Sequence, residues 1–213
     1  RCTLDELEPI VDRIREDFTQ RNEIRDLTLA RSRSLIRYCA NSIRATHRHE
    51  YDSARDLLDQ AREAAETMCQ DARSYADIYH AGYVQDALKE LAEATITLAL
   101  VMGEPLPDPD AMEVPYAPYL NGLGEAMGEM RRFALESIRR GDTEEAEALL
   151  GVMEEVYGQL VTIDFPGALT RGLRRTTDMV RGVTERTRGD LTTAVRQEKL
   201  QDALRHLEEK LGE

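Results

Sequence analysis

Two stretches of this chain determine how it folds: YHAGYVQDALKELAE, from Tyr79 to Glu93, and NGLGEAMGEMRR, from Asn121 to Arg132. Both read as helices, and each carries two glutamates that are three or four residues apart. Residues at these spacings lie on one face of a helix, so each pair projects from a single face. The four residues are Glu90, Glu93, Glu125 and Glu129. The two stretches therefore predict four carboxylates facing one another between two packed helices.

Oxygen-rich clusters of this kind suit Mg²⁺ or Mn²⁺, which proteins use to activate water and to stabilise charge at a phosphodiester. The plain alternative is a solvated acidic face. With 41 Asp and Glu among 213 residues, such pairs also arise by chance. The spacing alone therefore does not decide between a metal site and an exposed surface.

Composition predicts an all-α protein with one domain covering residues 1–213. Hydrophobic residues make up 41% of the chain, which is enough for a sizeable core. Charged residues reach 32% and runs of β-branched residues are few, which favours helices over sheets. We expect a soluble, cytoplasmic protein, because we find neither a signal peptide nor an apolar run long enough to cross a membrane. The three cysteines are odd in number and widely separated, which argues against disulfides.

Hydrophobic periodicity, punctuated by Pro and Gly, predicts an antiparallel bundle of about seven helices and no strand. The first helix, from Pro9 toward His47, is much longer than 25 residues, which indicates a bundle or an assembly. A break is expected at Gly189–Asp190. The other expected helices cover Tyr51–Asp71, Ala72–Met102, a segment after the proline-rich 104–118 connection, Thr143–Val161, a segment opened by Asp164, and Leu191–Leu211.

The net charge of −13 has the wrong sign for a surface that coats itself with nucleic acid. Any positive surface for RNA must be gathered locally, in a concave face or an interior. On the first helix, Arg33 and Arg37 begin an arginine stripe that Arg44 and Arg48 continue. Such a stripe either tracks a phosphate backbone or is a solvated face. Tyr83 either stacks on a base or packs in the core.

Four segments resemble the translin family, and translin-associated factor X (TRAX) more closely than translin. They are RDLTLARSRSLI (25–36), LKELAEA (88–94), YLNGLGEAMGEMRRFALESI (119–138) and the Gly141–Asp142 pair. The resemblance implies an all-α fold and self-association into a closed, hollow, octamer-like shell. Such a shell would answer the charge objection by placing the nucleic acid inside.

The resemblance also implies a role for the glutamates, because TRAX-type subunits supply a metal-dependent endoribonuclease site made of acidic residues. Translin has non-acidic residues at the two positions that match Glu90 and Glu93, whereas this chain is acidic at both. TRAX has Asp at the position of Glu125, so this side chain is one methylene longer here. Glu129, in GEMRR, matches the TRAX pattern.

The resulting hypothesis is an endoribonuclease in which Glu90, Glu93, Glu125 and Glu129 hold one or two Mg²⁺ or Mn²⁺ ions. Single-stranded RNA, or single-stranded DNA, is the expected partner. The residues expected to bind it are Arg33, Arg37, Arg132 and Tyr83. The alternatives are a shell that binds single strands without cutting them and a purely structural scaffold. A di-metal oxidase is disfavoured, because the Glu-x-x-His pairs of such sites are missing.

Overall fold

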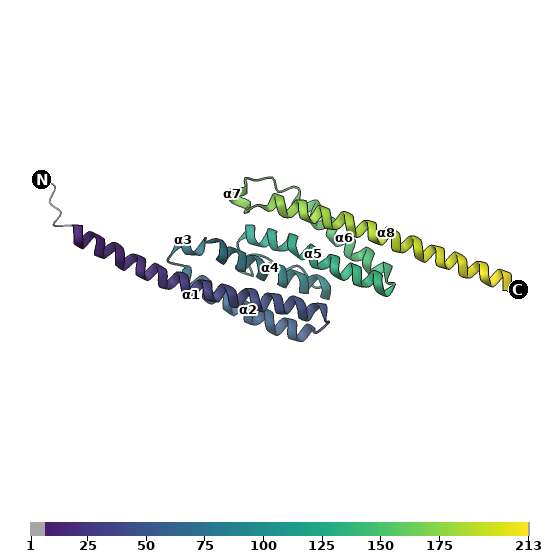
Figure 1. Ribbon diagram of the computed structural model, residues 1–213, viewed down its shortest axis with the longest axis horizontal. Helices are drawn as coiled ribbons and strands as arrows, with labels where there is room; N and C mark the ends of the chain where they lie inside the picture. The colour runs from purple at the N-terminus through teal and green to yellow at the C-terminus, as the bar shows by residue number, and fades with distance from the viewer. Residues whose placement is uncertain (1–6, 213) are drawn as a thin grey trace. The chain divides into compact units, whose positions relative to one another are not determined.

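The computed structural model describes residues 7–212, with side chains to residue 210, as eight α-helices and no strand (Figure 1). The all-α prediction is therefore confirmed for this part of the chain. The helices are α1 (Leu7–His47), α2 (Tyr51–Ala72), α3 (Ala76–Tyr79), α4 (Gly82–Met102), α5 (Tyr116–Arg140), α6 (Thr143–Leu160), α7 (Gly167–Thr170) and α8 (Leu173–Gly212). The chain divides inside α4, after Ala94, into two compact units, and each is described separately below. The single-domain assignment stays a prediction.

In the first unit, α1 and α2 form an antiparallel hairpin around the turn at 48–50, where His49 has a φ of 60°. One face of α1, in steps of four and three residues, is closed off completely by α2 and its neighbours. Its members are Thr28, Ser32, Leu35, Cys39, Ser42 and Thr46, each at most 1% exposed. The small hydroxyls let the helices approach closely, and Ser42 Oγ donates to the carbonyl of Ala54 at 2.9 Å.

The predicted helix from Ala72 to Met102 is wrong in its first part, where the chain turns twice. The short α3 occupies Ala76–Tyr79, and α4 begins only at Gly82. Glycine has a low helix propensity, and the turn is tied down because Gln85 Nε2 donates to the carbonyl of Tyr79 at 2.8 Å. Ile78, 6% exposed, packs inside. The hydrogen bond of Gln85 and the burial of Ile78 accompany an interruption that the apolar periodicity did not reveal.

The second unit is built on mutual packing of α5, α6 and α8. Helix α5 ends at Gly141, whose φ of 80° is the left-handed conformation that favours glycine. The next residue, Asp142, caps α6 by accepting from the backbone N–H of Glu145 at 2.9 Å. Glu145 Oε2 in turn accepts from Ser137 Oγ and from Arg140, each at 2.7 Å. Gly141 and Asp142 together therefore end α5 and begin α6.

Two boundaries near the C-terminus differ from the prediction. Pro166 caps the four-residue α7, which ends with Arg171 and Gly172 at positive φ, so Asp164 does not open a long helix. Helix α8 then runs without a break through Gly189. A glycine inside a helix costs only about 1 kcal/mol. Here Asp190 accepts from Arg131 at 2.9 Å and Leu191 is 2% exposed, so tertiary contacts hold the helix together.

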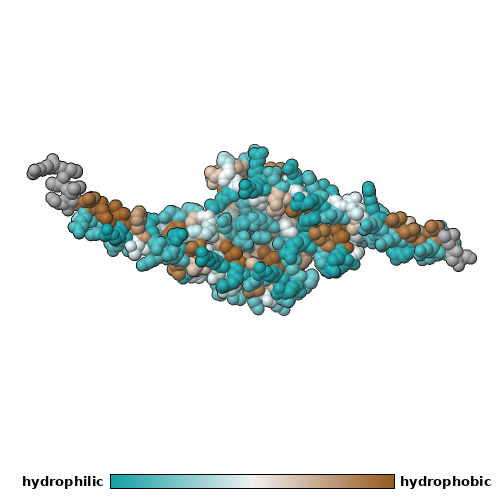
Figure 2. All heavy atoms as spheres, viewed as in Figure 1, coloured by the Kyte–Doolittle hydropathy of each residue, from teal (hydrophilic) through white to brown (hydrophobic). Residues whose placement is uncertain are grey.

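Hydrophobic residues are mostly interior, and Figure 2 shows a largely hydrophilic surface with apolar residues gathered along the first turns of α1. None of the described helices is both long enough and apolar enough to cross a membrane.

Candidate metal centre

Helix α4 is held in place at its start and along its apolar face. Near its first turn the hydroxyl of Tyr83 lies 2.9 Å from Thr28 Oγ1 of α1, in a hydrogen bond. Further along, Ala87, Leu88 and Leu91 are at most 1% exposed. A helix anchored in this way presents its next residues in a defined direction. Glu90 and Glu93 lie half-buried beside that apolar face.

Helix α5 is anchored through Asn121, which is 6% exposed. Its Nδ2 donates to the carbonyl of Thr170, at the end of α7, at 3.0 Å, and to the carbonyl of Ala117 at 2.8 Å. Its Oδ1 accepts from Thr176 Oγ1 of α8 at 2.5 Å. One buried amide thereby joins α5, α7 and α8, one helical turn before Glu125.

Glycine at position 124 lets α5 lie directly against α8. A Cβ built on Gly124 would lie 2.3 Å from Thr176 Cγ2 and 3.4 Å from Val180 Cγ2. The first distance is too short for two carbon atoms, and the β-branched Thr176 has little freedom to turn away. Gly124 therefore allows α5 to pack closely against α8 immediately before Glu125.

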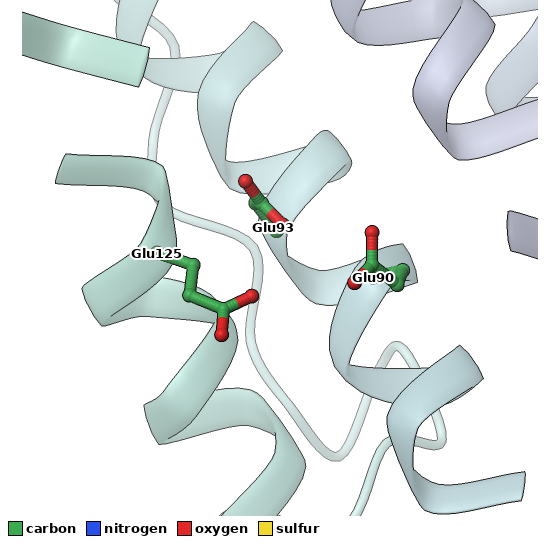
Figure 3. A group of neighbouring side chains, drawn as sticks. All are labelled: Glu90, Glu93 and Glu125. Carbon is green, nitrogen blue, oxygen red and sulfur yellow. The ribbon is translucent and has the colours of Figure 1, made fainter. Parts of the chain in front are cut away.

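The structure brings together three of the four predicted carboxylates. Glu90, Glu93 and Glu125 each offer a carboxylate oxygen, and these oxygens all lie within 4.8 Å of one another. Figure 3 shows the three side chains, two on α4 and one on α5, directed toward a common space. All three are half-buried. Three negative groups this close repel one another unless a cation or protons offset their charge.

Only oxygen donors make up the group, which fits a hard divalent cation better than a soft one. The chain itself also supplies a positive charge near the group, because Lys89 Nζ lies 3.4 Å from Glu90 Oε1. The negative charge of the α4 pair also reaches the core. Burial, and after it the charges of Glu90 and Glu93, raise the pKa of the Cys39 thiol on α1. The thiol is therefore held in its neutral form.

Glu129 is not a member of this close group. Its Oε2 accepts from Arg132 Nη1 at 2.9 Å, one turn further along α5. The glutamate is 18% exposed and the arginine 60% exposed. This pairing also gives Arg132, expected to contact RNA, a carboxylate partner. The metal-binding role of Glu129 stays a prediction.

The other predicted RNA contacts fall into two kinds. Arg33 and Arg37 are exposed on α1, and within residues 7–212 neither forms an ion pair. Arg37 lies over the ring of Tyr38, 5.8 Å from its centroid. Tyr83, by contrast, is half-buried and its hydroxyl is bound to Thr28, so the structure places it as a packing group between helices.

Several residues that shape the site did not stand out in the sequence. Asn121 opens the second quoted stretch, and its amide was a usable signal, because a polar residue between apolar neighbours needs a partner when buried. No local signal marks Thr176, which lies 55 positions away. The sequence indicated only that the three cysteines do not form disulfides, and the position of Cys39 near two glutamates depends on tertiary structure.

Similar proteins of known structure cover most of the chain. The crystal structure of the C3PO of Archaeoglobus is 33% identical, covers 88% of this chain and 97% of its own, and has a TM-score of 0.81. A structure of the same protein with duplex RNA is also 33% identical, covers 90% and 97%, and has a TM-score of 0.77. The apo C3PO of Nematostella, 22% identical over 87% and 97%, shares the fold with a TM-score of 0.79.

A further relative was found by comparison of sequences. An uncharacterized protein of Methanocaldococcus jannaschii is 27% identical over 207 residues, which are 96% of this chain and 90% of that protein. No protein-family model matches the sequence.

Proposed function

Because this chain belongs to the translin family, we propose that it is a metal-dependent endoribonuclease that binds RNA within a hollow assembly of several copies. The relative solved with duplex RNA supports the RNA-binding part of this proposal. The TRAX-like rather than translin-like character depends on the acidic residues at Glu90 and Glu93.

One observation carries the catalytic part: Glu90, Glu93 and Glu125 bring three carboxylate oxygens within 4.8 Å of one another. Half-buried carboxylates in such a group are costly without a positive charge. A bound Mg²⁺ or Mn²⁺ would offset this repulsion. When bound, such an ion lowers the pKa of water and neutralises charge that develops on a phosphodiester.

The chain's own residues would bind and orient the substrate. Arg33 and Arg37 have exposed guanidinium groups without acidic partners in the described chain, which suits them to phosphate oxygens. Arg132 is 60% exposed and can exchange Glu129 for a phosphate, because an exposed ion pair contributes little stability.

We infer that single-stranded RNA is the form that is cut, even where duplexes are also bound. A single strand can bend a phosphodiester toward half-buried carboxylates, whereas the phosphates of an A-form duplex are held in a stiff helix. Duplex binding by the Archaeoglobus relative is compatible with backbone contacts that do not depend on sequence.

The test uses end-labelled RNA of one sequence, supplied both as a single strand and as a duplex. The full-length protein is incubated with Mg²⁺ or Mn²⁺, and in parallel with excess chelator. Internal cleavage of the single strand that the chelator abolishes and Glu93→Gln removes is the expected result. Cleavage that persists in chelator, or that Glu93→Gln leaves at the wild-type rate, rejects the metal-site assignment.

A shell that binds RNA without cutting it is the second candidate. The pairing of Glu129 with Arg132 favours it, because the close group then offers three carboxylates rather than four. In this case both RNA forms are retained in a filter-binding assay, and neither is cleaved with any divalent ion.

A further inference from the structure

The face of α1 that packs in the core continues far beyond the part that is covered. The buried positions 28, 32, 35, 39, 42 and 46 follow steps of four and three residues. Extending the same register toward the N-terminus reaches positions 25, 21, 18, 14, 11 and 7. This is the seven-residue repeat of helices that pack along their length.

The early part of this face is apolar and open to solvent. Its members are Leu7, Val11, Ile14 and Phe18, with Ile10 beside them, and their exposed fractions are 51%, 39%, 48%, 64% and 40%. We name these five residues the N-terminal stripe. Figure 2 shows hydrophobic residues gathered on the first turns of α1. A shallow groove runs along the same face, lined by Val11, Ile14 and Phe18 and by polar neighbours.

Two arginines separate the buried part of the face from the N-terminal stripe. Arg21 is bound by Asp17 at 2.7 Å and by Asp77 at 3.0 Å, and lies over the ring of Tyr75. Arg25 pairs with Asp26. These polar groups mark where the intramolecular partners of α1 end. The apolar residues before them have the repeat of a helix that packs against another helix, yet their side chains are exposed.

We propose that the N-terminal stripe packs against the same stripe of a second copy of this chain, with the two helices antiparallel. With the midpoint between residues 12 and 13, Leu7 meets Phe18 of the second copy, and Val11 meets Ile14. Each contact then occurs twice, as two-fold symmetry requires. The large ring of Phe18 opposes the flexible Leu7, so the layers remain similar in size.

Charge on one flank of the stripe agrees with this register. In an antiparallel pair of this repeat, residues 8 and 15 of opposite copies lie side by side, which sets Glu8 against Arg15 of the second copy and the reverse. Arg15 is paired within its own helix to Asp12 at 2.5 Å, with side chains 69% and 58% exposed. Such an exposed pair contributes little and can be exchanged.

The size of the stripe is what a stable dimer contact needs. The exposed fractions of its five side chains correspond to about 500 Å² of apolar surface, and a standard interface takes about 800 Å² from each partner, rather more than half of it apolar. This inference rests on the assembly in the proposed function and identifies one of its contacts. It does not involve the carboxylates, so cleavage and assembly can fail separately.

The first test measures mass in solution by sedimentation velocity on the full chain. Ile14→Asp places two new carboxylates near the midpoint, so the largest wild-type species should be lost and the average mass should fall by about half or more. The control is Gln20→Asp, which adds the same charge on the outer face of α1. Circular dichroism shows that both variants remain folded. A monomeric wild type, or an unchanged mass for Ile14→Asp, overturns the proposal.

The second test fixes the partner and the direction by disulfide cross-linking, with Cys2 and Cys69 replaced by Ser. Leu7→Cys and Phe18→Cys chains, when mixed, should give a cross-linked dimer, and each variant alone should give much less. A Leu7→Cys chain that links efficiently to itself shows parallel helices. Linkage of Leu7→Cys to Leu204→Cys, on the exposed end of α8, shows that α8 covers the stripe. Either of these two results rejects the antiparallel pairing.

Discussion

The acidic pairs of α4 and α5 look alike in the sequence but behave differently in the structure. Glu90 and Glu93 of α4 both belong to the close carboxylate group. On α5 only Glu125 does, while Glu129 is bound to Arg132 at 2.9 Å. Spacing alone therefore placed each pair on one face of its helix but did not decide where each carboxylate points.

Each acidic pair has a different basic residue nearby. Lys89 lies next to Glu90 in sequence and remains 3.4 Å from its carboxylate, so it adds positive charge without drawing Glu90 out of the group. Arg132 lies three residues after Glu129, on the same face, and its planar guanidinium can hold a carboxylate. The arginine at i+3 thus holds Glu129, while Glu125 lies in the close group.

The largest effect is expected from neutralising a member of the close group. Glu125→Gln and Glu93→Gln should each lower the rate of RNA cleavage by about 100-fold or more, because a divalent ion loses an anionic ligand. Single-turnover cleavage of labelled RNA measures the loss. Glu155→Gln, at an exposed position on α6, is the control and should cut normally. Equal rates for Glu125→Gln and Glu155→Gln would remove α5 from the site.

Metal should stabilise the folded protein next most strongly. At about 100 times its Kd, an ion that binds only the folded state adds about 2.7 kcal/mol. Mn²⁺ should therefore raise the Tm in a thermal melt. Glu93→Gln should reduce this shift and should raise the Tm in the absence of metal, because it relieves repulsion within the group. A metal-free Glu93→Gln protein with a lower Tm would show that the three carboxylates are not strained by repulsion.

Removing the charge of Glu129 should have a smaller effect. Glu129→Gln is expected to reduce cleavage by about 10-fold, since the residue holds Arg132 rather than lying in the close group. Arg132→Gln should weaken RNA binding while leaving the metal-induced Tm shift intact. Complete loss of cleavage in Glu129→Gln would mean that the residue turns toward the group when metal binds, and the contrast with α4 would disappear.

The smallest effect is expected from the influence of Glu90 and Glu93 on the buried thiol of Cys39. The pKa of Cys39 is raised by burial and then by Glu90 and Glu93, so the folded state keeps the thiol proton where the unfolded state loses it. The unfolded state then binds fewer protons above pH ~8.5, and stability should fall as pH rises, by at most about 1.4 kcal/mol per pH unit. Urea unfolding between pH 8 and 10 should show that the free energy of unfolding falls less steeply with pH for Cys39→Ala than for the wild type. Equal slopes would contradict the raised pKa.

Local patterns predicted most of the fold. Apolar periodicity and the punctuation by proline and glycine were sufficient for α1, α2, α5 and α6, whose bounds depend on nearby residues. The failures concerned three helix boundaries, including Asp164, which does not open a long helix. Gly82 begins a helix and Gly189 lies inside one, although both are glycines in helical surroundings. At Gly189 the hydrogen bond from Arg131 to Asp190 joins segments 59 positions apart, which a local pattern does not contain.

The candidate site was predictable only in part for the same reason. Glu90, Glu93 and Glu125 followed from spacing together with the resemblance to the translin family. The exposed N-terminal stripe was signalled only by the length of its helix, because an apolar repeat looks the same whether its partner is internal or another copy. Tyr83 was open between stacking and packing, and its bond to Thr28 favours packing.

The missing side chain at position 124 has a consequence for variation in this protein. With Thr176 only 2.3 Å from where a Cβ would be, a saturation library at this codon should return glycine almost alone. A second-site mutation on α8 should compensate for Gly124→Ala. Thr176→Ser is an example, because it removes the obstructing methyl group and keeps the hydroxyl that donates to Asn121. The substitutions that position 124 tolerates, directly before Glu125, would thus depend on a threonine of another helix.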